Sequence, residues 1–180
     1  MRRGYEGVSA VDGALASFRR CPSCGSDEGS ATSAKRWACR ACGFEFFQNA
    51  AAAVIAIVRR PDGAVLFTRR ARPPAEGKLD LPGGFVDPGE AAEGALRREV
   101  LEEVGLQIEE ARFLASFPNR YLYAGVLYHT LDLVFDCHVI DPRAAAASDE
   151  VTATEWRDPC GVAPEELSFD SVRAAVRLLI

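Results

Sequence analysis

The chain has 180 residues, of which 48% are hydrophobic and 26% are charged, and its formal net charge is -5. This composition is typical of a globular protein, so disorder is excluded as the dominant state. The acidic balance gives no reason to expect DNA, RNA or an anionic membrane as a partner. The longest apolar run, residues 50–58, is too short to span a bilayer, and the N-terminal residues lack a signal-peptide core. We therefore expect a cytoplasmic protein.

Residues 1–17 are expected to form a weakly structured leader, and a cysteine-rich segment follows them. Four of the six cysteines form two Cys-x-x-Cys pairs: Cys21 with Cys24, and Cys39 with Cys42. Each pair places two thiolates on one tight turn, and two such turns complete the tetrahedral sulfur shell that suits Zn²⁺. The spacing predicts a zinc ribbon over residues 18–48, with a structural role or a role in forming a homodimer.

Two alternatives compete with zinc at these cysteines. Two disulfides would need an oxidising compartment, and a redox Cys-x-x-Cys usually occurs once, beside a βαβ unit. Ribbons also bind nucleic acid, but Lys35, Arg36 and Arg40 give that role thin support. Structural Zn²⁺ is the interpretation that the spacing favours.

Residues 49–180 carry the strand and helix signals of one larger domain. Apolar runs over 53–58 and 65–70 flank a Pro-Asp-Gly turn, and residues 79–84 predict a short strand ending in a glycine turn. A helix is expected over 90–104, with Gly105 as its C-cap. Strands are expected over 112–140, with breaks at 118–119 and 124–125, and another strand over 152–156. A final helix is expected over 171–180, with Asp170 or Ser171 as its N-cap. Mixed strands with two helices predict an α/β fold, arranged as an α/β/α sandwich.

The helix over 90–104 carries Glu99, Glu102 and Glu103 within an arc of about 100°. Ala92, Leu96, Val100 and Val104 form its buried stripe. Like charges so close together repel, and a hard divalent cation relieves that repulsion, because Mg²⁺ and Mn²⁺ prefer carboxylate oxygens. The alternative is an acidic helix face in solvent, with Arg97 and Arg98 as neighbours.

The residues around these glutamates favour the metal site. The full string is Gly84-x5-Glu90-x7-Arg98-Glu99-Val100-x-Glu102-Glu103-x-Gly105-Leu106. It resembles the Nudix box at every defining position. The resemblance implies a Nudix α/β/α sandwich with a mixed sheet over 49–180, and hydrolysis of a nucleoside diphosphate linked to another moiety.

The resemblance also implies roles for individual residues. The metal-binding and basic groups are Glu99, Glu102 and Glu103, the carbonyl of Gly83 is a backbone ligand, Arg98 orients a box glutamate, and Glu90 supports the loop. Whether Glu99 itself takes the proton differs between family members. Many Nudix enzymes draw a further carboxylate from a late loop, for which Glu150 is the candidate and Glu155 the alternative.

A zinc ribbon in front of a Nudix box resembles the NADH pyrophosphatase branch, which has a Ser-Gln-Pro-Trp-Trp-type signature after the box. The corresponding stretch here reads Ser116-Phe117-Pro118-Asn119-Arg120-Tyr121, without the glutamine and the tryptophans. The chain in this respect resembles the ribbon-bearing proteins called ADP-ribose pyrophosphatase-like. Phe117 and Tyr121 offer faces for base stacking and Asn119 offers hydrogen bonds, although such aromatics can equally be strand core.

The leading hypothesis is therefore a metal-dependent hydrolase that acts on an ADP-ribose-like or dinucleotide substrate and releases a mononucleotide. One alternative is a module with the same fold that senses nucleotides or associates with RNA without catalysis. Another is a nucleoside triphosphate pyrophosphohydrolase, which shares the box and differs in the pocket.

Overall fold

The computed structural model describes residues 14–148 and 151–180. The chain divides into two compact units. The smaller unit comprises Met1–Ala50 and Tyr121–His129, and the larger unit comprises Ala51–Arg120 and Thr130–Ile180. Most of the predicted leader lies outside the described residues, and the boundaries expected after residues 17 and 48 stay predictions.

The N-terminal part of the smaller unit is a three-stranded antiparallel sheet in the order β1-β2-β3. A buried tryptophan, Trp37, packs there with Leu15, Cys21 and Cys39. The elements are the 3₁₀ helix η1 (Ala14–Ser17), β1 (Gly29–Ser33), β2 (Arg36–Cys39) and β3 (Glu45–Phe47). Three short antiparallel strands beside two cysteine pairs agree with the predicted ribbon.

The larger unit contains two sheets. The first has the order β7-β4-β9-β8, and it is mixed because β4 runs parallel to β9 and antiparallel to β7. The second has the order β10-β5-β6 and is antiparallel. The strands are β4 (Ala51–Val58), β5 (Val65–Arg70), β6 (Leu79–Asp80), β7 (Gly83–Phe85), β8 (Ile108–Tyr123), β9 (Val126–Val139) and β10 (Val151–Arg157).

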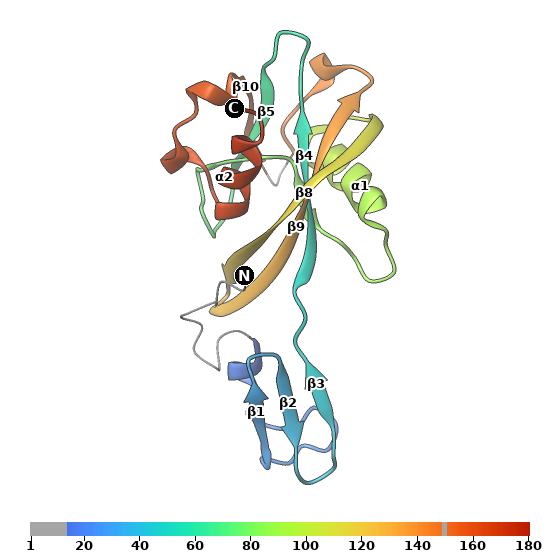
Figure 1. Ribbon diagram of the computed structural model, residues 1–180, viewed down its shortest axis with the longest axis vertical. Helices are drawn as coiled ribbons and strands as arrows, with labels where there is room; N and C mark the ends of the chain where they lie inside the picture. Colours follow the sequence, from blue (N-terminus) through green and yellow to red (C-terminus); the bar gives the residue numbers. More distant parts are fainter. Residues whose placement is uncertain (1–13, 149–150) are drawn as a thin grey trace, which may run out of the picture. The chain divides into compact units, whose positions relative to one another are not determined.

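Two helices cover this unit on opposite sides, α1 (Ala92–Val104) and α2 (Asp170–Arg177) (Figure 1). The predicted stripe of α1 is confirmed, since Leu96, Val100 and Val104 are buried in one core cluster with alternate residues of β4. The second cluster contains Ile55 and Ile57 of β4 together with buried residues of α2. The predicted α/β fold with a mixed sheet is therefore confirmed.

Short 3₁₀ helices complete the chain: η2 (Pro142–Ala144), η3 (Pro159–Gly161) and η4 (Pro164–Glu166). Within the described residues, neither α1 nor α2 combines the length and the apolar character that a helix needs to cross a bilayer.

The expected break at 118–119 is wrong, because β8 continues through Pro118 to Tyr123. The strand lies at the edge of its sheet, where a proline that cannot donate a hydrogen bond is tolerated. The break at 124–125 is confirmed as a two-residue turn, with φ values of 49° for Ala124 and 78° for Gly125.

Both helices also differ from the predicted bounds. Glu90 precedes α1, because its N–H donates to the Asp87 carbonyl in a turn (3.0 Å), and Ala91 is the N-cap. The N-cap of α2 is Phe169 rather than Asp170 or Ser171. The carboxylate of Asp170 instead accepts a hydrogen bond from Arg173 at 2.7 Å, and the helix ends at Arg177.

The predicted strand over 79–84 is divided between the two sheets. β6 pairs with β5, whereas β7 pairs with β4. Between them, the Pro82 carbonyl accepts a hydrogen bond from Ala56 at 2.8 Å. The expected glycine turn is wrong, because Gly83 and Gly84 are the first two residues of β7 and pair with β4. The crossing brings these two glycines to the edge of the mixed sheet, beside α1.

Candidate active site

Glu99 on α1 lies directly against the backbone of β7. A Cβ atom at Gly84 would lie 2.5 Å from Cδ of Glu99 and 2.6 Å from each of its carboxylate oxygens. Only glycine leaves room for a carboxylate at this distance, and the Glu99 side chain is 13% exposed. The strand and the helix thus meet at one of the three glutamates that the sequence predicts to bind metal.

Glu103 lies beside the first residue of the same strand, β7. Its Oε2 accepts a hydrogen bond from the N–H of Gly83 at 3.0 Å. Gly83, the predicted backbone ligand, pairs with Ile55 at the sheet edge. The two glutamates one helical turn apart are therefore both placed beside consecutive glycines of β7.

Arg98 connects the other acidic groups. Its Nη1 donates to Oε1 of Glu99 at 2.7 Å and to Oε2 of Glu102 at 3.2 Å. Its Nε and Nη2 bind Glu90 at 3.1 and 2.9 Å, and Nη2 also donates to the Phe85 carbonyl at 3.1 Å. These carboxylates raise the pKa of Arg98 further above its ordinary value. One guanidinium therefore fixes the helix, the preceding loop and β7 relative to one another.

Glu90 holds the loop before α1. Besides binding Arg98, it accepts a hydrogen bond from the N–H of Asp87 at 3.2 Å. The hydrogen bonds from Arg98 and then from Asp87 lower the pKa of Glu90 below its usual range. The residue therefore stays charged, and keeps the loop closed onto the helix, at neutral pH.

The three glutamates do not form one tight cluster. Glu102 is 60% exposed and is tied only to Arg98, whereas Glu103 is tied to Gly83. Among residues 14–148 and 151–180, the one group of His, Cys, Asp or Glu whose ligand atoms all lie within 4.8 Å is the group of ribbon cysteines.

The late carboxylate and the predicted substrate-binding residues lie elsewhere. Glu150 is outside the described residues, and Glu155 on β10 binds Arg69, whose Nε donates to it at 2.9 Å. Phe117 is partly buried against the second core cluster, which contains buried residues of α2. Asn119 is buried, and Tyr121 stacks on Tyr123 with ring centroids 6.2 Å apart.

The four ribbon cysteines meet as predicted: Cys21, Cys24, Cys39 and Cys42. All are free thiols, and Sγ of Cys21 lies 3.7 Å from Sγ of Cys42, while Sγ of Cys24 lies 3.8 Å from Sγ of Cys39. Four sulfurs at 2.3 Å from one tetrahedral Zn²⁺ would lie about 3.8 Å apart. The distances fit zinc and exclude the disulfide alternative.

The ribbon thiols also compete for protons. Burial raises the pKa of Cys21, but hydrogen bonds from the backbone of Cys24 and Ser23 outweigh it and lower the pKa to about 7. The pKa of Cys24 is raised to about 12, because its neighbouring thiols outweigh the backbone hydrogen bond from Ser26. A cation bound among them relieves this competition.

Two features of the larger unit were missed by the sequence reasoning. The contact between Gly84 and Glu99 was one, although the glycine belongs to the box. The other is a pair of buried polar residues on β9, Thr130 and Asp132. The sequence feature that could have indicated this pair is Asp132, an acidic residue between Leu131 and Leu133 in a predicted strand.

Comparison with known proteins then assigns the family. The NUDIX domain model matches residues 49–175. The chain belongs to the Nudix family. A protein named NAD-capped RNA hydrolase NudC, from Stutzerimonas stutzeri, is 30% identical to this Nudix chain over 148 residues, which are 79% of this chain and 49% of that protein. The chain spans about half the length of the NudC relatives that it matches.

Other relatives match this chain over a larger share of their own length. A protein named ADP-ribose pyrophosphatase, from Methanocaldococcus jannaschii, is 32% identical over 108 residues, covering 59% of this chain and 61% of that one. The crystal structure of a MutT NUDIX hydrolase from Burkholderia pseudomallei aligns with a TM-score of 0.57 and 28% identity, over 72% of this chain and 98% of that one. A NUDIX hydrolase from Nitrosomonas europaea has the same fold, with a TM-score of 0.64 at 22% identity over 89% of each chain.

Proposed function

We propose that this chain is a metal-dependent hydrolase that cleaves the diphosphate linkage of a nucleoside diphosphate derivative and releases a mononucleotide. The observation that carries the proposal is the arrangement of two α1 carboxylates at the glycines that begin β7. Glu99 lies against Gly84, and Glu103 accepts a hydrogen bond from Gly83. Because β7 is an edge strand, these two glycines lie at the border of the mixed sheet.

The oxygen atoms of the α1 glutamates and of Gly83 suit a hard divalent cation. Glu99, Glu102 and Glu103 offer carboxylate oxygens and Gly83 offers a carbonyl oxygen, which are the ligands that Mg²⁺ and Mn²⁺ prefer. The absence of a side chain at Gly84 keeps the space beside Glu99 free. Glu150 remains the proposed further ligand.

Once bound, such a cation neutralises charge on the diphosphate and lowers the pKa of a coordinated water. The protein residues supply position and proton transfer. Nη1 of Arg98 donates to both Glu99 and Glu102 while Nε and Nη2 bind Glu90, so that one planar guanidinium orients both metal-binding carboxylates. A box glutamate accepts the proton of the attacking water, and Glu99 and Glu103 are both candidates for this role.

The names of the relatives support the substrate class. They point to a dinucleotide or ADP-ribose-like diphosphate, cleaved so that a mononucleotide is released. Phe117, Asn119 and Tyr121 are the proposed substrate-binding residues of β8. The buried amide of Asn119 supports this role, because a polar side chain in a strand interior needs hydrogen-bond partners.

We further propose structural Zn²⁺ in the ribbon, bound by its four cysteines. Reduced cysteines with this spacing fit a cytoplasmic location. The ribbon is also the proposed site through which a homodimer forms.

A nucleotide panel tests the proposal. Purified protein with Mg²⁺ is incubated with ADP-ribose, NADH, other nucleotide sugars and nucleoside triphosphates, and the released mononucleotide is identified by chromatography. We expect AMP from ADP-ribose or NADH. Pyrophosphate release from triphosphates alone would favour the pyrophosphohydrolase alternative. Salt-sensitive RNA binding without any turnover would favour the non-catalytic module.

A further inference from the structure

The face of the mixed sheet opposite α1 carries buried polar side chains. On β9, Leu133 and Phe135 pack in the α1-side cluster, whereas Val134 packs in the α2-side cluster. Because successive strand residues point to opposite faces, Thr130 and Asp132 lie on the α2 side. They are 4% and 6% exposed.

Small side chains lie beside these polar residues. The parallel pairing of β4 with β9 places Ala51 next to Thr130 and Ala53 next to Asp132. On its other side, Ala53 pairs with Phe85 of β7, whose side chain is 41% exposed. Paired residues share a sheet face, so a carboxylate and an aromatic ring flank one methyl group. They are two strand spacings apart, which is about 9.6 Å.

The carboxylate of Asp132 has spare hydrogen-bonding capacity. Its Oδ1 accepts a hydrogen bond from the Thr130 hydroxyl at 2.6 Å, which is its one hydrogen bond within the described residues. Asp136, on the same strand and the same face, instead binds Arg59 at 3.1 Å and Arg112 at 3.4 Å. A buried carboxylate without a cation is costly unless donors reach it, so Asp132 is suited to accept hydrogen bonds from a ligand.

Asn119 extends this polar group. The two-residue turn at 124–125 places Tyr123 opposite Val126, and regular pairing counted back from it places Asn119 opposite Thr130. Asn119 is 9% exposed. We call the set Asn119, Thr130, Asp132, Ala51, Ala53 and Phe85 the β-face patch.

The β-face patch is adjacent to the candidate active site along β7. Gly84 faces Glu99, and its neighbour Phe85 points to the opposite face while its carbonyl accepts a hydrogen bond from Arg98. β7 is a three-residue edge strand. A nucleotide bound across it would place its diphosphate beside Gly83 and Gly84 and its base on the β-face patch.

We propose that the β-face patch binds the base of the substrate, and that Asp132 selects a base with an amino group at position 6. This inference rests on the proposed function. An ionised carboxylate only accepts hydrogen bonds, so it pairs with the amino group of adenine and opposes the oxygen of a 6-oxo base. The amide of Asn119 offers both a donor and an acceptor to the remaining base edge.

Binding of two nucleotides tests this selection. The affinities of ADP-ribose and of inosine diphosphate ribose, which differ in the amino or oxo group at position 6, are measured by calorimetry without added Mg²⁺. We expect wild type to prefer ADP-ribose at least about tenfold, because a polar site rejects an analogue that leaves its buried groups unpaired. In Asp132→Asn the preference should fall toward one, since an amide can donate to the 6-oxo group. Asp136→Asn is the matched control and should keep the wild-type preference, because its partners are Arg59 and Arg112.

Equal affinities in wild type, or an unchanged preference in Asp132→Asn, would overturn the inference. A second variant covers the case in which Asp132→Asn does not fold: Ala53→Leu should weaken both nucleotides by about tenfold or more, because its larger side chain occupies the space above the sheet. Unchanged affinities in Ala53→Leu would also overturn it. Because the readout is binding, a lack of turnover in wild type would refute the proposed function without deciding the base site.

Discussion

Gly84 and Glu99 are in a contact that requires glycine at position 84. The α carbon of Gly84 lies so close to Glu99 that an added Cβ would be 2.5 Å from its Cδ. Gly84 is held by pairing with Val54, and Glu99 is held by the helix and by Arg98. The position of the carboxylate is therefore set jointly by a strand and a helix that are separate in sequence.

The first prediction concerns this contact. In Gly84→Ala the new methyl group must displace the Glu99 carboxylate, at a cost in stability of about 1–3 kcal/mol. We expect turnover to fall by more than about tenfold and the Mg²⁺ concentration for half-maximal rate to rise, because misplaced ligands weaken both. Gly161→Ala is the control, since nothing lies within 4 Å of its added Cβ. Wild-type metal dependence in Gly84→Ala would contradict the proposed role of Glu99.

The second prediction concerns the guanidinium of Arg98. Arg98→Lys keeps the charge but loses the fork that binds Glu90, Glu99 and Glu102 at once. Turnover should fall by about 10–100-fold, with the loss mainly in kcat, because the residue orients ligands of the metal. Arg97→Lys on the same helix should retain activity, as Arg97 donates only to backbone carbonyls. Equal losses in the two variants would indicate a general effect on the helix.

The third prediction concerns pH. Glu90 has a lowered pKa in the folded state, first because of Arg98, so its ion pair stabilises the fold above the pKa of unfolded glutamate. This contribution is lost as the pH falls through the folded-state value. The difference in free energy of unfolding between wild type and Glu90→Gln, measured in urea, should thus be constant from pH 7 to about 5 and shrink below about 4. Glu93→Gln, at an exposed position of α1, should show no such trend.

The fourth prediction concerns zinc. Trp37 is buried with Cys39 and lies edge-on to Phe18, with ring centroids 5.8 Å apart. In a Trp156→Phe background, which leaves Trp37 as the one tryptophan, Cys39→Ser should remove about one zinc per chain and shift the emission to longer wavelength. Metal content measured beside fluorescence provides the check. Unchanged emission in zinc-free protein would mean that the ribbon folds without metal.

Much of the larger unit could be predicted from residue patterns. The stripe of α1 followed from the helical period, and β5 matches the expected residues 65–70. The box glutamates were assigned to a metal site through the resemblance of residues 84–106 to the Nudix box, because their spacing on the helix alone left an acidic solvent face open. Pro118 misled the prediction, since the sequence does not reveal that β8 is an edge strand, where proline is tolerated.

Of the β-face patch, Asn119 was predicted as a substrate-binding residue, whereas Thr130 and Asp132 could not be predicted, for a related reason. In the run Thr130-Leu131-Asp132-Leu133, alternation assigns the polar residues to a solvent face. The structure instead buries Thr130 and Asp132 on the face of β9 that also carries Val134 of the second core cluster, and alternation alone does not reveal which face of a strand is covered. The bond between Gly83 and Glu103 likewise depends on how β7 leaves one sheet for the other.

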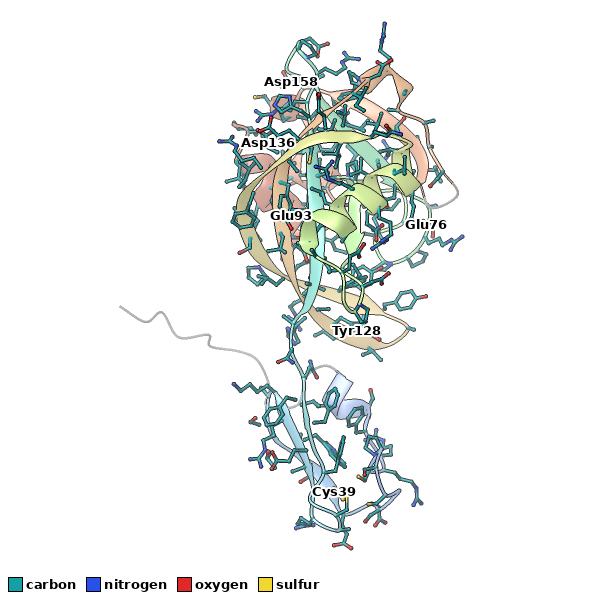
Figure 2. The ribbon with its side chains drawn as sticks, turned by 90° about the vertical axis from the view of Figure 1, so that its right-hand side faces the viewer. Cys39, Glu76, Glu93, Tyr128, Asp136 and Asp158 are labelled. Atoms are coloured by element: carbon teal, nitrogen blue, oxygen red, sulfur yellow. The ribbon has the colours of Figure 1, made fainter. Side chains whose placement is uncertain are left out.

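The most direct test of metal-dependent diphosphate hydrolysis is the rate of AMP release from ADP-ribose in the presence of Mg²⁺, compared between wild type, Glu103→Gln and Glu93→Gln. Glu103 binds the backbone of Gly83, whereas Glu93 lies exposed on the same helix (Figure 2). We predict AMP release by wild type and Glu93→Gln, and a loss of at least about a hundredfold in Glu103→Gln. Full activity of Glu103→Gln, or no AMP release by wild type, would contradict the proposed function.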